Sequence, residues 1–334
     1  MPSFSIIIPF KTGKAYLMEC LQSALAQDYV NFEIIILADN TSNHDGSLDA
    51  VNQINDSRIK IETSNNTLNI LENWSRIKQI TRMEYMTILG YDDLLSPQFL
   101  STIVAQIKDQ PTASLYHTHF NYISANGALI NPCQSLPKQL SANDYLTLSL
   151  QDKISVMATG YVFKSLDYDA VGGIPIYYPN LIYADLFLWI ELSKISYLAV
   201  SPDYCFSFRI HNSTTKTSKD KILLNAFVVY LTYLQKLTAE NPCFEKTIRL
   251  YLPAFLANTT RAMAHRLLRT EKIDRDGFSL ELIFETIAQS ASIFGIAYNP
   301  LDIPTLKMTK WIDNTPIIHR LFLFFKKVYK KPIY

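Results

Sequence analysis

The sequence has few cysteines and no charge excess of either sign. Four cysteines in 334 residues (Cys20, Cys133, Cys205 and Cys243) are widely spaced, so they form neither the paired spacing of a zinc site nor a dense disulfide framework. The formal net charge is +1, which excludes a broad basic surface for nucleic acid. We therefore expect free thiols in a reducing, cytoplasmic compartment and no nucleic-acid partner.

Signals for targeting or membrane crossing are missing as well. The first residues, MPSFSIIIPFKTGK, lack a basic segment followed by a long apolar core and a small-residue cleavage site, so we do not interpret them as a signal peptide. No segment is expected to reach the roughly 20 apolar residues that cross a bilayer. The sequence thus predicts a protein that does not span a membrane, although it can lie on one.

The composition, 48% hydrophobic and 18% charged, supplies a sizeable core, and the length suggests one large domain with a smaller addition. Apolar β-branched runs alternate with helical spacing over about the first 100 residues, which predicts a mainly parallel sheet flanked by helices. The expected strands are 5–9, 32–37, 58–62 and 85–89, and the expected helices are 17–25, 45–54, 70–80 and 97–107. The fold class is therefore α/β.

The second half of the sequence changes character. An antiparallel insertion is expected around Asn126-Gly127, followed by a helix at 141–151, a strand at 156–163, a helix at 183–194 and an extended segment at 196–209. Beyond Lys216 the pattern is almost wholly helical, with segments at 219–238, 244–270 and 278–293 and a last helix from Pro316. We expect a sheet domain at 1–214 and a helical region at 215–334.

Polar residues follow the expected strands at their carboxyl ends, where open parallel sheets bind ligands. The three ends read Pro9-Phe10-Lys11, Ala38-Asp39-Asn40 and Gly90-Tyr91-Asp92-Asp93. Asp39 can accept hydrogen bonds from a base or ribose, or it can serve as a helix cap. The adjacent carboxylates of Asp92 and Asp93 suit a hard divalent ion, or they form a polar turn before the helix that starts near Ser96-Pro97.

The ordered segments SIIIPF, FEIIILADN, LENWSR, ILGYDDLLSP, YADLFLWIEL and FRIHNST resemble the successive motifs of family 2 glycosyltransferases with the GT-A fold, of the bacterial surface polysaccharide type. The likeness covers about residues 3–214. It implies that Asp39 holds the nucleotide base, that Asp92 and Asp93 contact ribose and metal, and that Asp185 is the catalytic base. It also implies that His211 contacts diphosphate or metal.

One position departs from that pattern. Many members read D-x-D-D at the fourth strand, and this chain has Gly90 in place of the first aspartate. Metal binding, by Mn²⁺ or Mg²⁺, is then expected to depend on Asp93 and His211, with Asp92 as a further candidate ligand.

We assign nucleotide binding to Pro9, Phe10, Asp39, Arg76 and Asp92. Arg76 lies near the start of a helix and can approach the donor. Alternatively, it lies on the surface of a capped helix beside a packed tryptophan.

Catalysis is assigned to the region after residue 180. Asp185 begins a helix pinned into the core by Leu188 and Trp189, so its first turn can face a cleft, although a first-turn aspartate also stabilises a helix dipole. Arg209 and His211 lie in a polar strand end and suit the diphosphate leaving group.

The last helix carries cations on one side. From Pro316, His319, Arg320 and the lysines up to Lys331 fall within an arc of roughly 140° at about 100° per residue. We expect 316–331 to lie on an anionic membrane interface, or to pack on the domain with a solvated basic face.

These residues together predict an inverting glycosyltransferase that moves a sugar from a nucleotide diphosphate donor, a UDP-sugar, to a hydroxyl of a saccharide or lipid-linked acceptor. Its setting would be surface polysaccharide or glycoconjugate synthesis, in the cytoplasm or on the inner face of the plasma membrane. Two alternatives stay open at this point. One is an inactive nucleotide-sugar-binding or scaffold protein of the same fold, and the other is a nucleotidyltransferase, for which the loop PFKTGK is sparse in glycine.

Overall fold

The computed structural model describes residues 1–211 and 217–328. Two compact units are present, one formed by Met1–Tyr145 with Ile154–Ser213 and the other by Leu146–Lys153 with Thr214–Tyr334. Residues 212–214 of the FRIHNST motif and residues 329–331 of the expected terminal helix lie outside the described residues.

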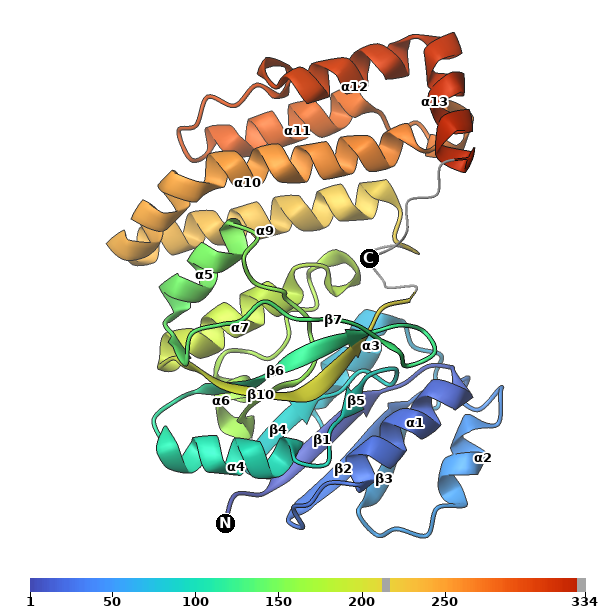
Figure 1. Cartoon of the computed structure of the whole chain (residues 1–334), viewed down its shortest axis with the longest axis vertical. Helices are drawn as coiled ribbons and strands as arrows, with labels where there is room; N and C mark the ends of the chain where they lie inside the picture. The colour runs from blue at the N-terminus through green and yellow to red at the C-terminus, as the bar shows by residue number, and fades with distance from the viewer. Residues whose placement is uncertain (212–216, 329–334) are drawn as a thin grey trace. The chain divides into compact units, whose positions relative to one another are not determined.

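The first unit is built on a mixed sheet with helices packed against it (Figure 1). Its strands within the described residues are β1 (Phe4–Pro9), β2 (Phe32–Ala38), β3 (Ile59–Thr63), β4 (Tyr85–Ile88), β5 (Leu94–Leu95), β6 (Leu115–Ile123), β7 (Leu129–Pro132), β8 (Gln139–Leu140), β9 (Tyr161–Lys164) and β10 (Leu198–Arg209). The strand order is β3-β2-β1-β4-β9-β6-β10-β5, with β7 paired to β6 and β8 to β10.

The order of the strands creates a switch point at the centre of the sheet. The chain moves outward from β1 to β2 and β3, and then returns to form β4 on the other side of β1, with all of these pairs parallel. The strand β9 runs antiparallel between β4 and β6. The strands β1 and β2 are buried along their whole length and are apolar except for Ser5 and Glu33, whose side chains hydrogen-bond to each other, which suits a sheet covered on both faces. Loops after β1 and β4 therefore meet where such folds bind ligands.

Helices connect and cover these strands. They are α1 (Lys14–Leu25), α2 (Ser47–Asn52), α3 (Ile70–Ser75), α4 (Phe99–Asp109), α5 (Ala142–Leu150), α6 (Ser165–Ala170) and α7 (Ala184–Ile195), with 3₁₀ turns η1 (Arg76–Lys78) and η2 (Pro179–Leu181). A capping box begins α3, because the Asn69 side chain accepts from the Glu72 amide and the Glu72 carboxylate accepts from the Asn69 amide. The sequence pattern predicted these elements except β5, β8, α6 and η2.

The second unit consists mainly of helices: α9 (Asp220–Glu240), α10 (Pro242–Leu268), α11 (Leu280–Ser292), α12 (Pro304–Asn314) and α13 (Pro316–Val328), with turns η3 (Lys272–Arg275) and η4 (Pro300–Asp302). The helix α10 packs on α9, α11 and α12. Asn241 separates α9 from α10 and caps the latter, because its side chain accepts from the Cys243 amide at 2.8 Å. The sequence did not predict α12.

One helix departs from the expectation about membrane-spanning segments. Within the described residues, α9 has the length and the mean hydropathy, 1.3, that a span requires, and half of the window is buried inside the structure. A core helix of a folded domain passes the same test. The expectation that no segment reaches this length and hydropathy was therefore wrong for α9.

Candidate functional site

A tight turn after β4 folds two carboxylates back toward the sheet. The Asp93 amide donates to the Gly90 carbonyl oxygen at 3.0 Å. The buried Asp93 carboxylate accepts hydrogen bonds from the Arg209 backbone amide at 3.0 Å and from the Thr159 hydroxyl at 2.8 Å. Burial first, and then the charge of Asp92, raise the pKa of Asp93 well above its ordinary value. Asp93 is thus an enclosed group that ties the end of β10 to this turn.

The space beside Gly90 is filled by these carboxylates. A Cβ at this position would lie 2.6 Å from Asp93 Oδ2 and 2.9 Å from Asp92 Oδ1. Atoms do not approach so closely in a packed protein, so a side chain would fit only if the turn moved. In this conformation the turn therefore has room only for glycine at position 90, where the D-x-D-D pattern has an aspartate.

Arg209, at the end of β10, directs its guanidinium into the fold. Its Nε donates to the Asp92 carbonyl oxygen at 2.7 Å, its Nη1 to the Ala125 carbonyl oxygen at 3.0 Å, and its Nη2 to the Glu19 carboxylate at 2.7 Å. The guanidinium carbon also lies 4.8 Å from the centre of the Tyr16 ring. Arg209 fixes the backbone of the turn in this arrangement, which differs from the direct diphosphate contact expected from the sequence.

Asp92 and His211 form the pair that reaches solvent. Asp92 Oδ2 contacts His211 Nε2 directly, and the two side chains are 22% and 20% exposed. The Tyr16 ring lies 5.2 Å from the imidazole ring. Within residues 1–211 and 217–328, no group of three or more histidine, cysteine, aspartate or glutamate side chains is arranged to hold a metal. A divalent ion on this pair would draw its other ligands from substrate or water, which is the usual arrangement for Mg²⁺ beside phosphates.

Asp39, at the end of β2, is buried beneath a lysine. Its Oδ2 contacts Lys11 Nζ and accepts from the Leu68 amide at 2.8 Å, while Oδ1 accepts from the Thr41 amide at 2.9 Å and the Ser42 hydroxyl at 3.0 Å. Burial by itself raises the pKa of Asp39, but the hydrogen bonds, that from Lys11 first, hold it well below its ordinary value. Asp39 is therefore an anion covered by a cation.

Two side chains from the α3 region bind the carbonyl oxygens at the strand ends. The Asn73 amide donates to the Leu37 carbonyl oxygen at 3.0 Å. Arg76 donates from Nη1 to the Ala38 carbonyl oxygen and from Nη2 to the Glu62 carbonyl oxygen, both at 2.8 Å. Arg76, which was expected near the donor, thus holds the ends of β2 and β3 together.

Phe10 and Tyr91 join the Asp39 and Asp92 clusters at the switch point. Phe10 is buried, and its ring meets the Tyr91 ring edge-on at 5.5 Å. Tyr91 also covers Gly13, whose φ is +120° and where a Cβ would lie 2.9 Å from the ring, so this approach requires glycine. Pro9 is buried in β1. Pro9 and Phe10, which were expected to bind the nucleotide, are buried and lie between the two clusters.

The N-terminus of α1 is already occupied by Asp45. Its Oδ2 accepts the backbone amides of Gly13 at 3.0 Å and Lys14 at 2.9 Å. Hydrogen bonds, that from Ser47 first, hold the pKa of Asp45 well below its ordinary value. Because an anion fills this helix end, the loop after β1 offers no phosphate-binding turn of the kind that a nucleotidyltransferase uses.

Asp185 lies in the first turn of α7 and is partly exposed. Its Oδ1 accepts from the Leu186 amide at 2.9 Å. Burial raises the pKa of Asp185 to about 6, and backbone hydrogen bonds offset part of this effect. Burial first, and then the charge of Asp185, raise the pKa of Tyr183. A carboxylate of this kind is ionised at neutral pH and has a pKa close to the pH at which a general base works best.

The chain that enters α7 holds an unusual backbone. Asn180, Leu181 and Tyr183 have φ values of 51°, 59° and 69°, a left-handed conformation that residues other than glycine rarely adopt. Such strain costs free energy and is found mostly at functional sites. These left-handed residues directly precede Asp185, which supports a functional role for this end of α7.

A short segment before β9 connects α7 to the β4 turn. The Trp189 indole donates to the Met157 carbonyl oxygen at 2.9 Å, and the Thr159 hydroxyl bonds to Asp93. Asp185 precedes Trp189 by four residues, which is about one helical turn. This connection fixes α7 to the turn indirectly and does not itself place the Asp185 carboxylate against the Asp92 pair.

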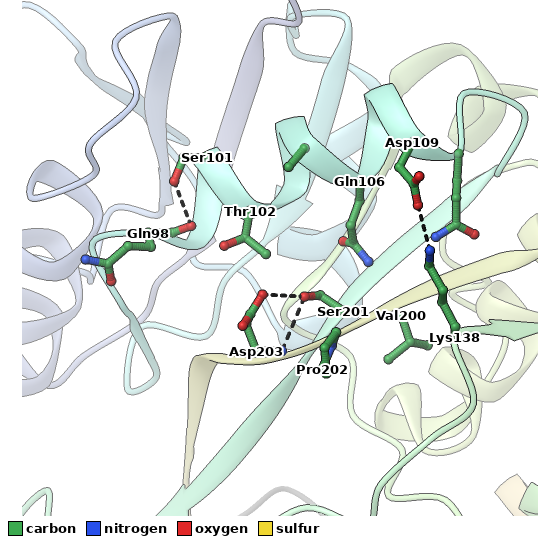
Figure 2. A pocket seen from close by; sticks show the side chains of 12 residues that line it. Gln98, Ser101, Thr102, Gln106, Asp109, Lys138, Val200, Ser201, Pro202 and Asp203 are labelled. Carbon is green, nitrogen blue, oxygen red and sulfur yellow. Dashed lines mark hydrogen bonds and ion pairs between the residues drawn. The ribbon is translucent and has the colours of Figure 1, made fainter.

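A separate groove of about 430 Å³ runs between α4 and β10 (Figure 2). Lys138 and Asp109 pair across it at 2.8 Å, and the Ser201 hydroxyl donates to Asp203 at 2.8 Å. Its lining includes none of the residues expected from the sequence to bind a ligand. The groove is therefore distinct from the clusters at the carboxyl ends of β2 and β4.

Comparison with known proteins identifies a family for the N-terminal part of the chain. Residues 5–164 match the family described as Glycosyl transferase family 2. The chain carries a family 2 glycosyltransferase domain. The matched residues include Asp39 and Asp92, whereas Asp185 and His211 follow them, and the roles of all four are proposals.

Two curated relatives show how far the likeness of the family 2 domain extends. Glycosyltransferase GlyG of Streptococcus pneumoniae is 26% identical over 124 residues, 37% of this chain and 41% of GlyG. The Escherichia coli enzyme named UDP-Glc:α-D-GlcNAc-diphosphoundecaprenol β-1,3-glucosyltransferase WfaP is 25% identical over 225 residues, 67% of this chain and 84% of WfaP. The chain thus spans less than half of GlyG and most of WfaP.

A solved structure shares the architecture. Residues 1–349 of S. aureus TarS, in complex with UDP-GlcNAc, superpose with a TM-score of 0.55 at 13% identity, covering 99% of this chain and 93% of that one. At this identity the likeness shows the fold alone. The family 2 domain has the GT-A fold followed by helices, as the sequence predicted.

Four side chains of the family 2 site were not assigned a role from the sequence. They are Lys11, which covers Asp39; Glu19 and Tyr16, which hold Arg209; and Thr159, which binds Asp93. Lys11 follows a strand end, a position that could have identified it. The other three come from elements that only the folded chain brings to the turn, so the sequence contains no local signal for them.

Proposed function

We propose that this family 2 domain transfers a sugar from a nucleoside diphosphate donor to a hydroxyl of a saccharide acceptor, with inversion at the anomeric carbon. The observation that carries the proposal is the partly exposed Asp92–His211 pair, which stands at the switch point beside the Asp39 cluster. Ligands of open α/β sheets bind in this position.

Asp39 and Lys11 support a nucleoside site at the end of β2. Lys11 is about half exposed while Asp39 is enclosed, so movement of Lys11 would open Asp39 Oδ2 to a base N–H or a ribose hydroxyl. The displaced ammonium would then lie near the diphosphate as a balancing charge. We propose a uridine nucleotide, because the names of WfaP and of the TarS complex specify UDP-sugars.

Asp92 and His211 would hold a divalent ion, Mn²⁺ or Mg²⁺, which family 2 enzymes commonly use. Both side chains are partly exposed, and carboxylate and imidazole are suitable donors. Asp93 was expected as the ligand, but Thr159 and Arg209 occupy its oxygens, so we propose that it positions the turn instead. When bound, such an ion supplies positive charge to the departing diphosphate.

Asp185 would accept the proton of the acceptor hydroxyl as that oxygen attacks the anomeric carbon. Its raised pKa, to about 6, keeps it ionised at neutral pH and basic enough to take the proton. One base and one in-line displacement complete the reaction without a covalent sugar–enzyme intermediate, which is why we propose inversion.

The acceptor is proposed to be a lipid-linked saccharide at the inner face of the plasma membrane, in surface polysaccharide synthesis. The name of WfaP, with its diphosphoundecaprenol acceptor, supports this class. We further propose that residues 1–214 carry the catalytic function and that residues 215–334 form a separate helical region.

Incubation of the full chain with UDP-glucose, UDP-GlcNAc, UDP-galactose and GDP-mannose, in the presence of Mn²⁺, tests the proposed activity. We expect release of free UDP from at least one donor, increased by a saccharide acceptor and stopped by EDTA. Donor binding without release in any combination would identify an inactive binding protein. Pyrophosphate formed from a nucleoside triphosphate and a sugar phosphate would identify a nucleotidyltransferase, and either result contradicts the proposal.

A further inference from the structure

The terminal helix α13 turns its apolar face outward. Ile317, Leu321, Phe324 and Val328 are 74%, 62%, 68% and 70% exposed. Their spacings of four, three and four residues align them along one side of the helix, and we refer to these four residues as the apolar stripe. Within the helical unit, α13 follows α12 at the C-terminal end of the chain (Figure 1).

The opposite side of α13 is anchored in the helical unit. His319 is buried, and its Nε2 lies 2.9 Å from the Leu268 carbonyl oxygen and 3.4 Å from Arg275 Nη2. The Phe322 ring meets the His265 ring edge-on at 6.2 Å. The sequence predicted that His319 would belong to the solvated basic side. The structure buries His319 and leaves the apolar stripe outside.

Cations border the apolar stripe. Arg320 and Lys327 are exposed, and at about 100° per residue they lie beside the stripe on the same flank. The helix Pro316–Val328 contains no aspartate or glutamate, and the sequence continues with Lys330 and Lys331. An exposed apolar row with a cationic border matches helices that lie in a membrane interface.

We propose that α13 docks on an anionic lipid bilayer, with the apolar stripe among the headgroups and Arg320 and Lys327 on the lipid phosphates. Charge complementarity favours this occupant over a second copy of the chain. An antiparallel two-fold contact between two α13 helices would bring Arg320 and Lys327 of one copy toward the same cations of the other, and in either orientation the helix offers no acidic side chain to neutralise them. Anionic headgroups supply that neutralisation.

Co-sedimentation of the full chain with lipid vesicles tests the docking. We expect binding to vesicles of equal parts phosphatidylglycerol and phosphatidylcholine, weakened by salt, and much less binding to phosphatidylcholine alone. The double variant Leu321→Glu with Phe324→Glu replaces two apolar side chains of the stripe with carboxylates and should lower binding at least tenfold. Replacing Arg320 or Lys327 with glutamine should lower binding to the anionic vesicles about fivefold each.

The matched control is Leu166→Glu, which changes an equally apolar side chain that is 79% exposed in α6, and it should bind vesicles like the wild type. Failure of the wild type to bind anionic vesicles, or equal binding by the double variant, would overturn the proposal. A dimer in light scattering that the double variant dissociates would assign the stripe to a second copy instead. Release of UDP with a soluble acceptor should be the same in the double variant as in the wild type. Failure of the docking proposal can therefore be distinguished from failure of the proposed activity.

Discussion

Replacing Asp185 with asparagine is expected to lower kcat for sugar transfer by about 10³-fold, the contribution of a well-placed general base, while donor affinity stays close to that of the wild type. Asparagine keeps the size of the side chain at the first turn of α7 but cannot take a proton. Steady-state release of UDP gives kcat, and calorimetry gives the donor Kd. The matched control is Glu191→Gln on the same helix, where the carboxylate pairs with Lys194 at 3.1 Å, and its kcat should be near that of the wild type.

The pH profile gives the same assignment a second test. The pKa of Asp185 is raised to about 6, and the base works in its deprotonated form. The wild-type kcat should therefore fall about tenfold for each pH unit below 6 and be level just above that pH. A variant Asp185→Asn with wild-type turnover would show that another group accepts the proton.

Replacing Asp92 with asparagine is expected to weaken Mn²⁺ binding in the presence of UDP by at least about tenfold and to lower kcat/KM by about 100-fold. The change removes the negative charge of the partly exposed carboxylate, while Asp93 and Arg209 continue to hold the turn. Electron paramagnetic resonance of free Mn²⁺ measures the first effect without relying on turnover, and steady-state kinetics measure the second.

The matched control for Asp92 is Asp203→Asn. Asp203 is an exposed carboxylate on β10 that accepts from the Ser201 hydroxyl at 2.8 Å, and its loss should leave both measurements unchanged. If Asp92→Asn bound Mn²⁺ as tightly as the wild type, Asp92 would be removed from the proposed metal site and Asp93 would have to be reconsidered.

The fold could be predicted where local sequence determines it. The strands Phe4–Pro9 and Phe32–Ala38 are apolar except for Ser5 and Glu33, because both faces of the sheet are covered, and such runs are visible without coordinates. The two-residue strands β5 and β8 form only by pairing with β10, so no hydrophobic periodicity in the sequence predicts them. The GT-A fold itself was predicted through the order of six motifs, since no one of them is specific.

The sequence predicted the strand ends that carry the candidate site residues, but it did not predict the contacts of their side chains. Asp39, Asp92 and Asp93 were chosen because they follow strands, where the topology of such sheets places ligands. The partners of each polar atom depend on tertiary packing, which the sequence does not show. Arg209 therefore turned out to point into the fold, and Asp93 to be enclosed, although both belong to the motifs that drew attention to them.

The central claim is that the Asp92–His211 pair and Asp39 form one site for a metal-bound nucleoside diphosphate. Crystals of the full chain grown with UDP and Mn²⁺, with anomalous diffraction recorded at the manganese edge, test it most directly. The account predicts a manganese peak held by Asp92 and His211, with the uracil beside Asp39. Manganese and UDP found in the groove between α4 and β10, with the Asp92–His211 pair making no contact to either, would contradict it.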